Sequence, residues 1–149
     1  MRRKRPRTPA RTRTSSNVPR FFVAGLPQPG GSKKGFPVRR KTGKMGVAIV
    51  DANPKVKAWQ AVVKAAARKV VARRDAGPVQ LILDFHLPRG KTVTRDQHTV
   101  KPDALKLARA VEDALTGIAY TDDAQVVCGS QSKQYAVTES EVGVWITVL

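Results

Sequence analysis

Residues 79–87 read VQLILDFHL and residues 104–115 read ALKLARAVEDAL, and these two stretches show the clearest secondary-structure patterns of the chain. In the first, apolar and polar side chains alternate, which predicts a half-buried strand. In the second, apolar side chains recur at the spacing of one helical face, which predicts a helix that packs through that face. The residues expected on the inner face of this helix are Leu107, Ala108, Val111 and Leu115.

A second helix is predicted before the strand. Asn53-Pro54 is a typical helix start, with Asn as the N-cap and Pro in the first position, and Gly77-Pro78 predicts the end. Apolar residues follow the start at spacings of three and four, at Val56, Trp59, Val63, Ala66 and Val70. We therefore expect this helix, with Trp59 included, to pack into the core.

Further strands are predicted on both sides of this centre. Residues 20–26 form a first strand, 124–135 and 142–149 form the last two, and 36–50 predict a hairpin with a basic turn. The resulting order, βαβαββ with an extra N-terminal hairpin, predicts an α+β domain in which a mixed β-sheet packs with two main helices. A chain of 149 residues is long enough for one such domain.

The composition excludes several classes of protein. The single cysteine, Cys128, excludes a disulfide framework and a cysteine-ligated zinc site. No apolar run approaches the ~20 residues that a membrane span requires, so we expect no membrane partner.

Positive charge is concentrated in the first third of the chain. The sequence has 28 Lys and Arg against 11 Asp and Glu, a net charge of +17. Residues 1–50 hold 14 of the basic residues and no acid, since the first acid is Asp51. Such a block is typical of a protein with a polyanionic partner, most often nucleic acid.

Residues 1–17 are predicted to be a disordered basic arm, because arginines alternate there with Pro, Thr and Ser and almost nothing is apolar. We expect this arm either to bind phosphates or only to be a solvated, charged extension of the chain. A nuclear or organellar targeting signal remains an alternative, whereas secretion is not expected because no apolar segment follows.

A second basic stretch covers residues 32–52. It is either a solvated loop or a surface that lies along a phosphate backbone. Together with two cations of the helix predicted to start at Asn53-Pro54, its basic residues form the expected DNA-binding set: Lys33, Lys34, Arg39, Arg40, Lys41, Lys44, Lys57 and Lys64.

Acids are scarce but clustered. Six of the 11 lie between residues 96 and 123, namely Asp96, Asp103, Glu112, Asp113, Asp122 and Asp123. Carboxylates in a basic surface suit a divalent-cation phosphodiesterase, because Mg²⁺ prefers oxygen ligands and assists hydrolysis while nearby cations hold the polyanion.

More ordinary roles remain open for the same residues. Asp103 follows Pro102 and could cap the helix predicted over residues 104–115, Asp122 and Asp123 suit a turn, and Glu112 with Asp113 suits a solvated helix face. On composition alone, a metal-dependent nuclease and a non-catalytic nucleic-acid-binding module are both open.

The acidic segments resemble the signature of a known family. Residues 98–103 (HTVKPD), 113–117 (DALTG) and 122–126 (DDAQV) follow in the order and spacing of the RusA family, the Holliday junction resolvases of bacteria and prophages. Weaker similarities extend over residues 20–149 and leave out the basic arm. The resemblance implies a RusA-like nuclease domain over residues 18–149.

The resemblance also implies a function. Members are Mg²⁺-dependent endodeoxyribonucleases (Mn²⁺ is an alternative ion) that act as homodimers on four-way DNA junctions in recombination and repair. Each subunit cuts one of two opposed strands and leaves a 5′-phosphate and a 3′-hydroxyl. A cytoplasmic location, in a bacterial or phage-infected cell, is expected on the same grounds.

The family roles carry over by position. Asp103 and Asp123 match catalytic, metal-binding aspartates, and Asp122 is a further candidate ligand. Arg109 stands where the family commonly has a catalytic lysine, and Asp113 is expected to support the site.

Two residues depart from the family pattern. Leu105 replaces the family's second aspartate, and leucine cannot bind Mg²⁺. Arg109 keeps the charge of the family lysine but does not transfer protons, so Lys101 or Lys106 would have to do so if a lysine were essential. The alternative function is therefore a junction- or nucleic-acid-binding protein with weak or no cleavage.

Two further alternatives concern His98 and the chain as a whole. His98 is a candidate supporting residue that contacts a phosphate or the outer shell of the metal, and a histidine bonded to loop backbone is the other reading. A small RNA-binding protein would share the size and charge of this chain, but the clustering of acids speaks against it.

Overall fold

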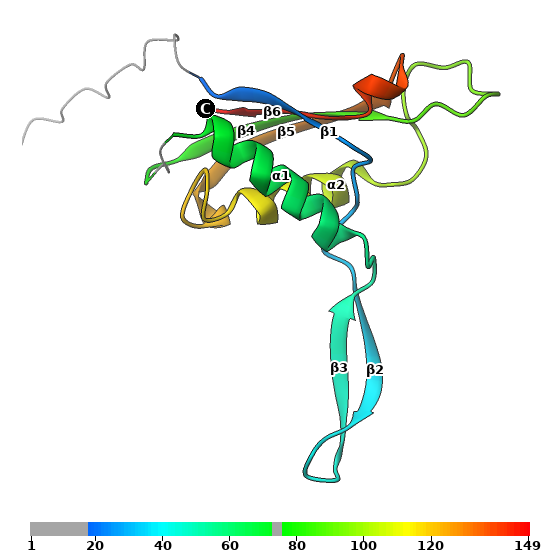
Figure 1. Ribbon diagram of the computed structural model, residues 1–149, viewed down its shortest axis with the longest axis vertical. Helices are drawn as coiled ribbons and strands as arrows, with labels where there is room; N and C mark the ends of the chain where they lie inside the picture. The colour runs from blue at the N-terminus through cyan, green and yellow to red at the C-terminus, as the bar shows by residue number, and fades with distance from the viewer. Residues whose placement is uncertain (1–17, 73–75) are drawn as a thin grey trace, which may run out of the picture.

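The computed structural model describes residues 18–72 and 76–149, so the predicted disordered arm lies outside the described residues. The elements confirm the predicted α+β fold and the order βαβαββ with an early hairpin (Figure 1). They are β1 (Arg20–Ala24), β2 (Lys33–Arg39), β3 (Met45–Asp51), α1 (Val56–Val70), β4 (Val79–Leu87), α2 (Ala104–Leu115), β5 (Val126–Tyr135) and β6 (Gly143–Val148), with short 3₁₀ helices η1 (Asp123–Gln125) and η2 (Glu139–Glu141).

Four strands form a mixed sheet in the order β1-β6-β4-β5. β4 and β5 are parallel, and α2 lies in the connection between them, as a parallel pair requires. β6 pairs antiparallel with both β4 and β1. The loop after β4, helix α2 and the turn before β5 are therefore all parts of one crossover connection.

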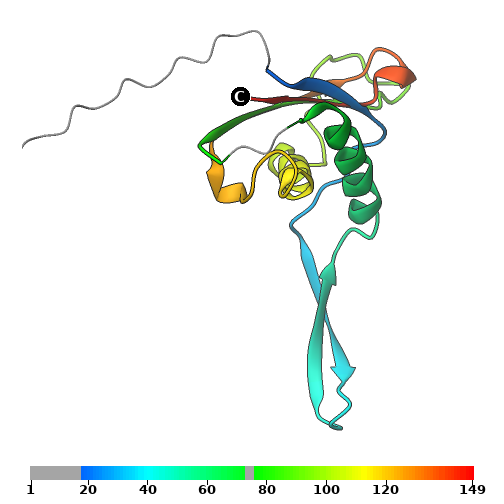
Figure 2. The ribbon, with the colours of Figure 1, turned by 60° about the vertical axis from the view of Figure 1, so that its left-hand side comes forward.

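Both helices cover the same face of the sheet, which Figures 1 and 2 show from two directions. β4 buries alternate residues toward them, as its pattern predicted. α2 buries all four residues of the predicted stripe, together with Ala110 and Ala114. A single apolar core therefore lies between the helices and the sheet.

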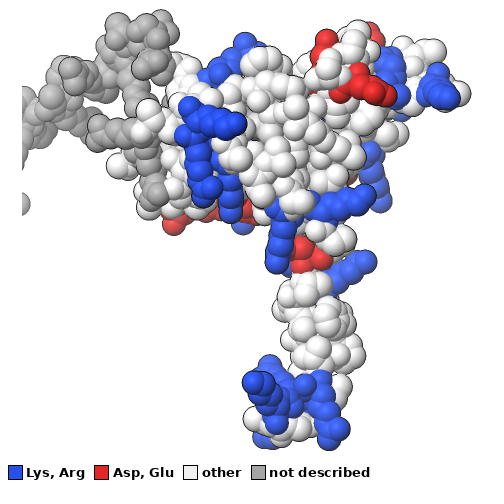
Figure 3. All heavy atoms as spheres, viewed as in Figure 1, with Lys and Arg blue, Asp and Glu red and all other residues white. Residues whose placement is uncertain are grey.

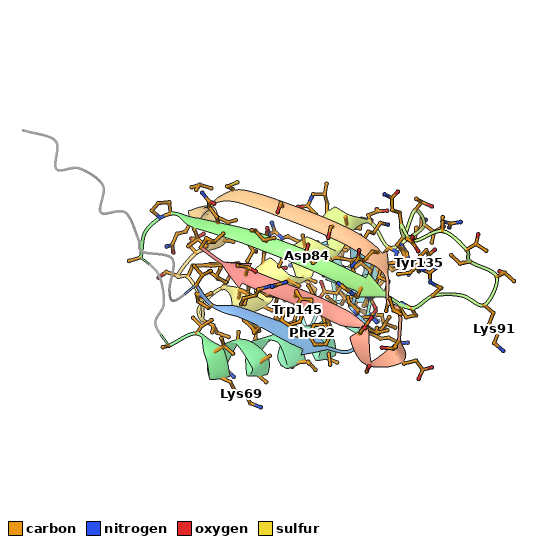
Figure 4. The ribbon with its side chains drawn as sticks, turned by 90° about the horizontal axis from the view of Figure 1, so that it is seen from above. Phe22, Lys69, Asp84, Lys91, Tyr135 and Trp145 are labelled. Atoms are coloured by element: carbon orange, nitrogen blue, oxygen red, sulfur yellow. The ribbon has the colours of Figure 1, made fainter. Side chains whose placement is uncertain are left out.

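The other face of the sheet is seen in Figure 4. Phe22 and Trp145 pack against each other there at 5.2 Å between ring centroids, and the Arg20 guanidinium lies 4.7 Å from the Trp145 ring. Asp84 accepts a hydrogen bond from Ser132 on the neighbouring strand at 2.8 Å. Asp84 thus belongs to a cross-strand contact on this face.

Helix α1 departs from the prediction at both ends. It begins at Val56, because Asn53 and Pro54 form a preceding turn in which the Asn53 side chain accepts a hydrogen bond from the Lys55 amide at 3.1 Å. It ends at Val70, well before Gly77. Trp59 is buried as expected.

The inner face of α1 also ends differently from the prediction. Ala67 is fully buried, whereas Val70 is 43% exposed and Ala66 only flanks the core. The buried residues of α1 still recur every three or four positions, but in the last turn the buried residue is Ala67 rather than Ala66 or Val70.

Candidate active site

Helix α2 presents one outer face that carries most of the candidate residues. Its buried apolar stripe turns Lys106, Arg109 and Asp113 outward, at positions that a helix places in a row. Asp103 occupies the N-cap position in extended backbone, but its side chain makes no cap hydrogen bond. Its closest ion-pair partner is the Lys106 ammonium, at 3.9 Å. The Asp103 carboxylate is therefore available for a ligand rather than used as a cap.

Arg109 lies between two carboxylates. Its Nε is 3.2 Å from Asp113 Oδ1, one helical turn along α2, and its terminal nitrogen is 3.7 Å from Asp123 Oδ2 in the following turn. The structure thus brings together Arg109, Asp113 and Asp123 from two segments of the chain. Asp113 holds the guanidinium that Asp123 also contacts.

The turn that carries Asp123 is fixed by local hydrogen bonds. The Asp122 carboxylate accepts from the Ala124 amide at 2.8 Å, and the Gln125 side chain accepts from the Asp122 amide at 3.0 Å, which together make a capping box. The turn role expected as an alternative for Asp122 is therefore present. Asp123, one residue on, is turned toward α2.

Negative charge is dense around Arg109. Burial raises the pKa of the Glu112 carboxyl, and the Asp123 and Asp113 carboxylates raise it further, while Arg109 opposes them. Such mutual repulsion between carboxylates is what a bound cation relieves.

The loop before Asp103 is held from β5. The Lys133 ammonium donates hydrogen bonds to the carbonyl oxygens of Val100, at 2.5 Å, and Pro102, at 2.8 Å. Because these carbonyls lie directly before Asp103, Lys133 fixes the approach of the chain to the site.

His98 packs at the base of the same loop. It is 7% exposed, and its ring lies 4.7 Å from the Tyr135 ring. Burial lowers the pKa of the imidazole, and the nearby Lys133 cation lowers it further. Neutral His98 is thus part of the packing that supports the loop.

A groove of about 510 Å³ that was not predicted joins the α2 face to the base of the β2–β3 hairpin. Its lining includes Gly30, Gly31, Lys33, Asp51, Gln60, Arg109 and Asp113. Lys33 and Asp51 form an ion pair across the two strands, which lowers the pKa of Asp51.

Two glycines beside this groove allow the chain to pass close to α2. The Gly30 amide donates to the Lys106 carbonyl at 2.8 Å, and a Cβ on Gly30 would lie 3.1 Å from the Ala110 Cβ. Gly31 adopts a φ of +81° beside the Arg109 side chain. The adjacent glycines after Pro29 were the signal that could have indicated a close crossing of the chain over a helix.

The predicted DNA-binding cations divide into separate groups. Lys33 and Lys34 lie at the base of the hairpin, and Lys33 shares a second groove with Lys57. Arg39, Arg40, Lys41 and Lys44 lie at the hairpin tip, at the far end of a ladder of seven residue pairs that is roughly 20 Å long. Figure 3 shows this tip as a basic cluster apart from the body. Lys64 lies on α1. The basic stretch is therefore a two-stranded hairpin rather than a loop.

Leu105 lies in the first turn of α2 and is 71% exposed. Residues four apart on a helix are neighbours, so Leu105 adjoins Arg109, and it is two residues from Asp103. A large apolar side chain thus projects into solvent from the acidic surface.

A comparison of sequences decides the family. The profile described as Endodeoxyribonuclease RusA matches residues 32–148. The chain belongs to the RusA family. No individual curated protein matches it. The RusA family comprises endodeoxyribonucleases that resolve Holliday junctions, and the matched range contains each of the acidic residues described above.

Two observations bear on the metal and the membrane. In residues 18–72 and 76–149, no three His, Cys, Asp or Glu side chains are grouped so as to hold one ion. Within the same residues, the helices are too short or too polar to span a membrane. The oxygen donors nonetheless suit Mg²⁺ chemically, since Mg²⁺ is usually bound by one or two carboxylates together with waters and substrate phosphates.

Proposed function

We propose that the chain is a Mg²⁺-dependent endodeoxyribonuclease that cuts four-way DNA junctions as a homodimer, with Asp103 and Asp123 at its centre. The observation that carries the proposal is the α2 face. On this face of a RusA-family chain, the Asp103 side chain makes no cap hydrogen bond, and Arg109 forms ion pairs with both Asp113 and Asp123. Mn²⁺ is the alternative ion.

The residues of the α2 face have distinct roles in this proposal. Asp103 and Asp123 supply carboxylate oxygens for the ion, and Asp122 contributes to the same turn. The ion supplies charge stabilisation at the phosphorus centre and activation of water. Arg109 balances the carboxylates before DNA binds and holds a phosphate oxygen afterwards, but a guanidinium transfers no proton. Lys101 and Lys106 are the nearby groups able to do so.

The cations act through the DNA backbone. Those of the hairpin base, the hairpin tip and α1 are exposed or half-buried, and each binds phosphate without reading sequence. Placed on a projecting hairpin and on the body, they can contact more than one arm of a branched substrate. In this proposal, the spacing of the cations favours branched DNA over a linear duplex, because only branched DNA offers phosphates to both groups at once.

A second function is favoured by Leu105. With this residue in place of an aspartate, the acidic surface lacks one carboxylate beside Asp103, and a junction-binding protein with weak cleavage fits that surface. Cleavage and binding must therefore be measured separately.

The substrate class is tested by competition binding in EDTA, where no hydrolysis occurs. We expect the full chain to bind a synthetic four-way junction at least tenfold more tightly than a linear duplex of the same sequence at equal salt. A matched RNA duplex is the control. Equal affinity for all three would contradict both junction-directed functions.

Lys133 provides a test of how Asp103 is positioned. Lys133→Met keeps the aliphatic stem but loses both hydrogen bonds to the loop, so we expect the free energy of unfolding to fall by about 2 kcal/mol. We also expect the rate of junction cleavage to fall about tenfold, with junction affinity nearly unchanged.

Two variants control this experiment. Lys133→Arg retains a donor and should recover most of the activity, and Gln131→Met, at an exposed position of β5, should behave like the unmodified protein. If Lys133→Met cleaved as fast as Gln131→Met, the loop contact would have no role in positioning Asp103.

A further inference from the structure

The β2–β3 hairpin stands apart from the rest of the fold. It forms a two-stranded sheet of its own, and Figures 1 and 2 show it projecting away from the body. In the described chain, its strands pack extensively only against each other. Isolated two-stranded hairpins are marginally stable in water. A projecting hairpin of this length therefore calls for a partner.

The middle of the hairpin contains no ionisable side chain. We define the hairpin shaft as residues 35–38 and 45–50, which read GFPV and MGVAIV. Charged residues lie only beyond it, at the base and at the basic tip, and Figure 3 shows the uncharged shaft between them.

Both faces of the hairpin shaft are apolar. The strand register places Ile49, Val47 and Met45 on one face, and Val50, Phe36 and Val38 on the other. A hairpin that rests on a body, or lies in water, normally keeps one polar face. The two-sided pattern indicates that the shaft is covered by protein.

The exposed area suits a self-association interface. Met45, Val47 and Ile49 are 68%, 64% and 70% exposed, and Phe36 and Val50 are each 45% exposed. Over both faces these side chains expose on the order of 500 Å² in one copy, so a dimer in which each copy covers both faces of the other's shaft would bury about 1,000 Å², the size at which specific interfaces begin.

The outer edge of β2 is unsuited to strand addition. Hydrogen bonds at Ser32–Ala52 and Arg40–Lys44 fix the alternation of the ladder, and this alternation turns the nitrogen of Pro37 outward. Proline has no amide hydrogen, so this edge lacks a donor at its middle. A partner is therefore held mainly by the faces of the shaft.

We propose that the hairpin shaft is the dimerisation element of this protein and packs against a second copy of the chain. The inference rests on the proposed function, which includes a homodimer, and it names the surface that forms it. In a two-fold interface the same patch is buried on both copies, so an apolar ribbon is its own complement. DNA is the less suitable occupant, because phosphates require cations and the shaft has none. The basic tip stays free to reach DNA.

The test is the oligomeric state of the full chain without DNA, measured by sedimentation velocity over a range of micromolar concentrations. Val47→Lys with Ile49→Lys places two charges on one face of the shaft. We expect the unmodified protein to be a dimer and the dissociation constant of this double variant to rise at least 100-fold. Its circular dichroism spectrum should match that of the unmodified protein, since neither residue belongs to the core, while its melting temperature should fall only as far as the loss of the dimer requires.

The matched control is Val127→Lys, in β5. Val127 is 67% exposed, so a lysine replaces a valine at similar exposure but on the body. We expect its dissociation constant to stay within threefold of the unmodified value.

The other outcomes are distinguishable. If the double variant remained a dimer as tight as the control, the shaft would not be the interface, while the homodimer of the proposed function would stand. If the unmodified protein were a monomer, and the double variant bound a junction differently from the control, the shaft would contact DNA and the dimerisation inference would be overturned.

Discussion

Replacing Leu105 by aspartate is expected to increase the rate of junction cleavage at limiting Mg²⁺ by about 10- to 100-fold, or about 1.4 to 2.7 kcal/mol. The new carboxylate would lie two residues from Asp103 and one helical turn from Arg109, at the position where the resemblance to the family leads us to expect an aspartate. The apparent affinity for Mg²⁺ should rise with the rate, because an added carboxylate strengthens an oxygen-ligand site.

The fold should tolerate this change. Leu105 is 71% exposed, so little buried apolar surface is lost. The first turn of α2 contains no acidic residue, and an acid there interacts favourably with the helix dipole by about 0.3 to 1 kcal/mol. A gain in activity with unchanged or slightly higher stability would separate chemistry from folding.

Leu105→Asn is the matched control, since it has the size and polarity of aspartate without the charge. Cleavage is measured on a labelled junction as Mg²⁺ is varied, for both variants and the unmodified chain. If Leu105→Asp were no faster than Leu105→Asn, the missing carboxylate would not be what limits this site.

The second large effect is expected at Asp103. Asp103→Asn should lower the rate of cleavage by about 10³-fold or more, equivalent to about 4 kcal/mol, because it removes an anionic oxygen from the proposed metal site. The Asp103 side chain makes no cap hydrogen bond, so the free energy of unfolding should change by less than about 0.5 kcal/mol. Junction affinity should be retained, since a negative charge is lost near DNA.

Asp122→Asn provides the comparison for this result. Asparagine keeps a side-chain oxygen that can accept from the Ala124 amide, so the turn should survive, and we expect a loss of less than about tenfold. Single-turnover cleavage and binding in EDTA are measured for both variants. Cleavage by Asp103→Asn within tenfold of the unmodified rate would remove Asp103 from the chemistry.

Local patterns predicted the elements that carry the site. β4 and α2 bury the side chains that their periodicities indicated, so the outward positions of Arg109 and Asp113 could be derived from the sequence. The turn role of Asp122 was also visible, because the residues of a capping box lie within a few positions of one another.

Long-range features were not predictable in the same way. The contact of Arg109 with Asp123, and the crossing of Gly30 over α2, depend on how distant segments meet. Ala66 and Ala67 were equally apolar in the sequence, and only the packing of α1 against its neighbours decided which is buried.

The hairpin illustrates another limit. Its alternation predicted strands, but a pattern of apolar residues shows only that burial is favoured and does not identify the partner. Val47 and Ile49 remain 64% and 70% exposed in the single chain.

The proposed junction-cutting activity is tested by strand-by-strand mapping of cleavage on a four-way junction. Each strand is labelled in turn and incubated with the full chain and Mg²⁺, beside a linear duplex and an EDTA control, with Leu105→Asp in parallel. We expect paired nicks at matching positions in two opposed strands, ends that a ligase can seal, and no cleavage of the duplex or in EDTA. Equal cleavage of the linear duplex, or no cleavage of the junction by either protein, would contradict the proposed activity.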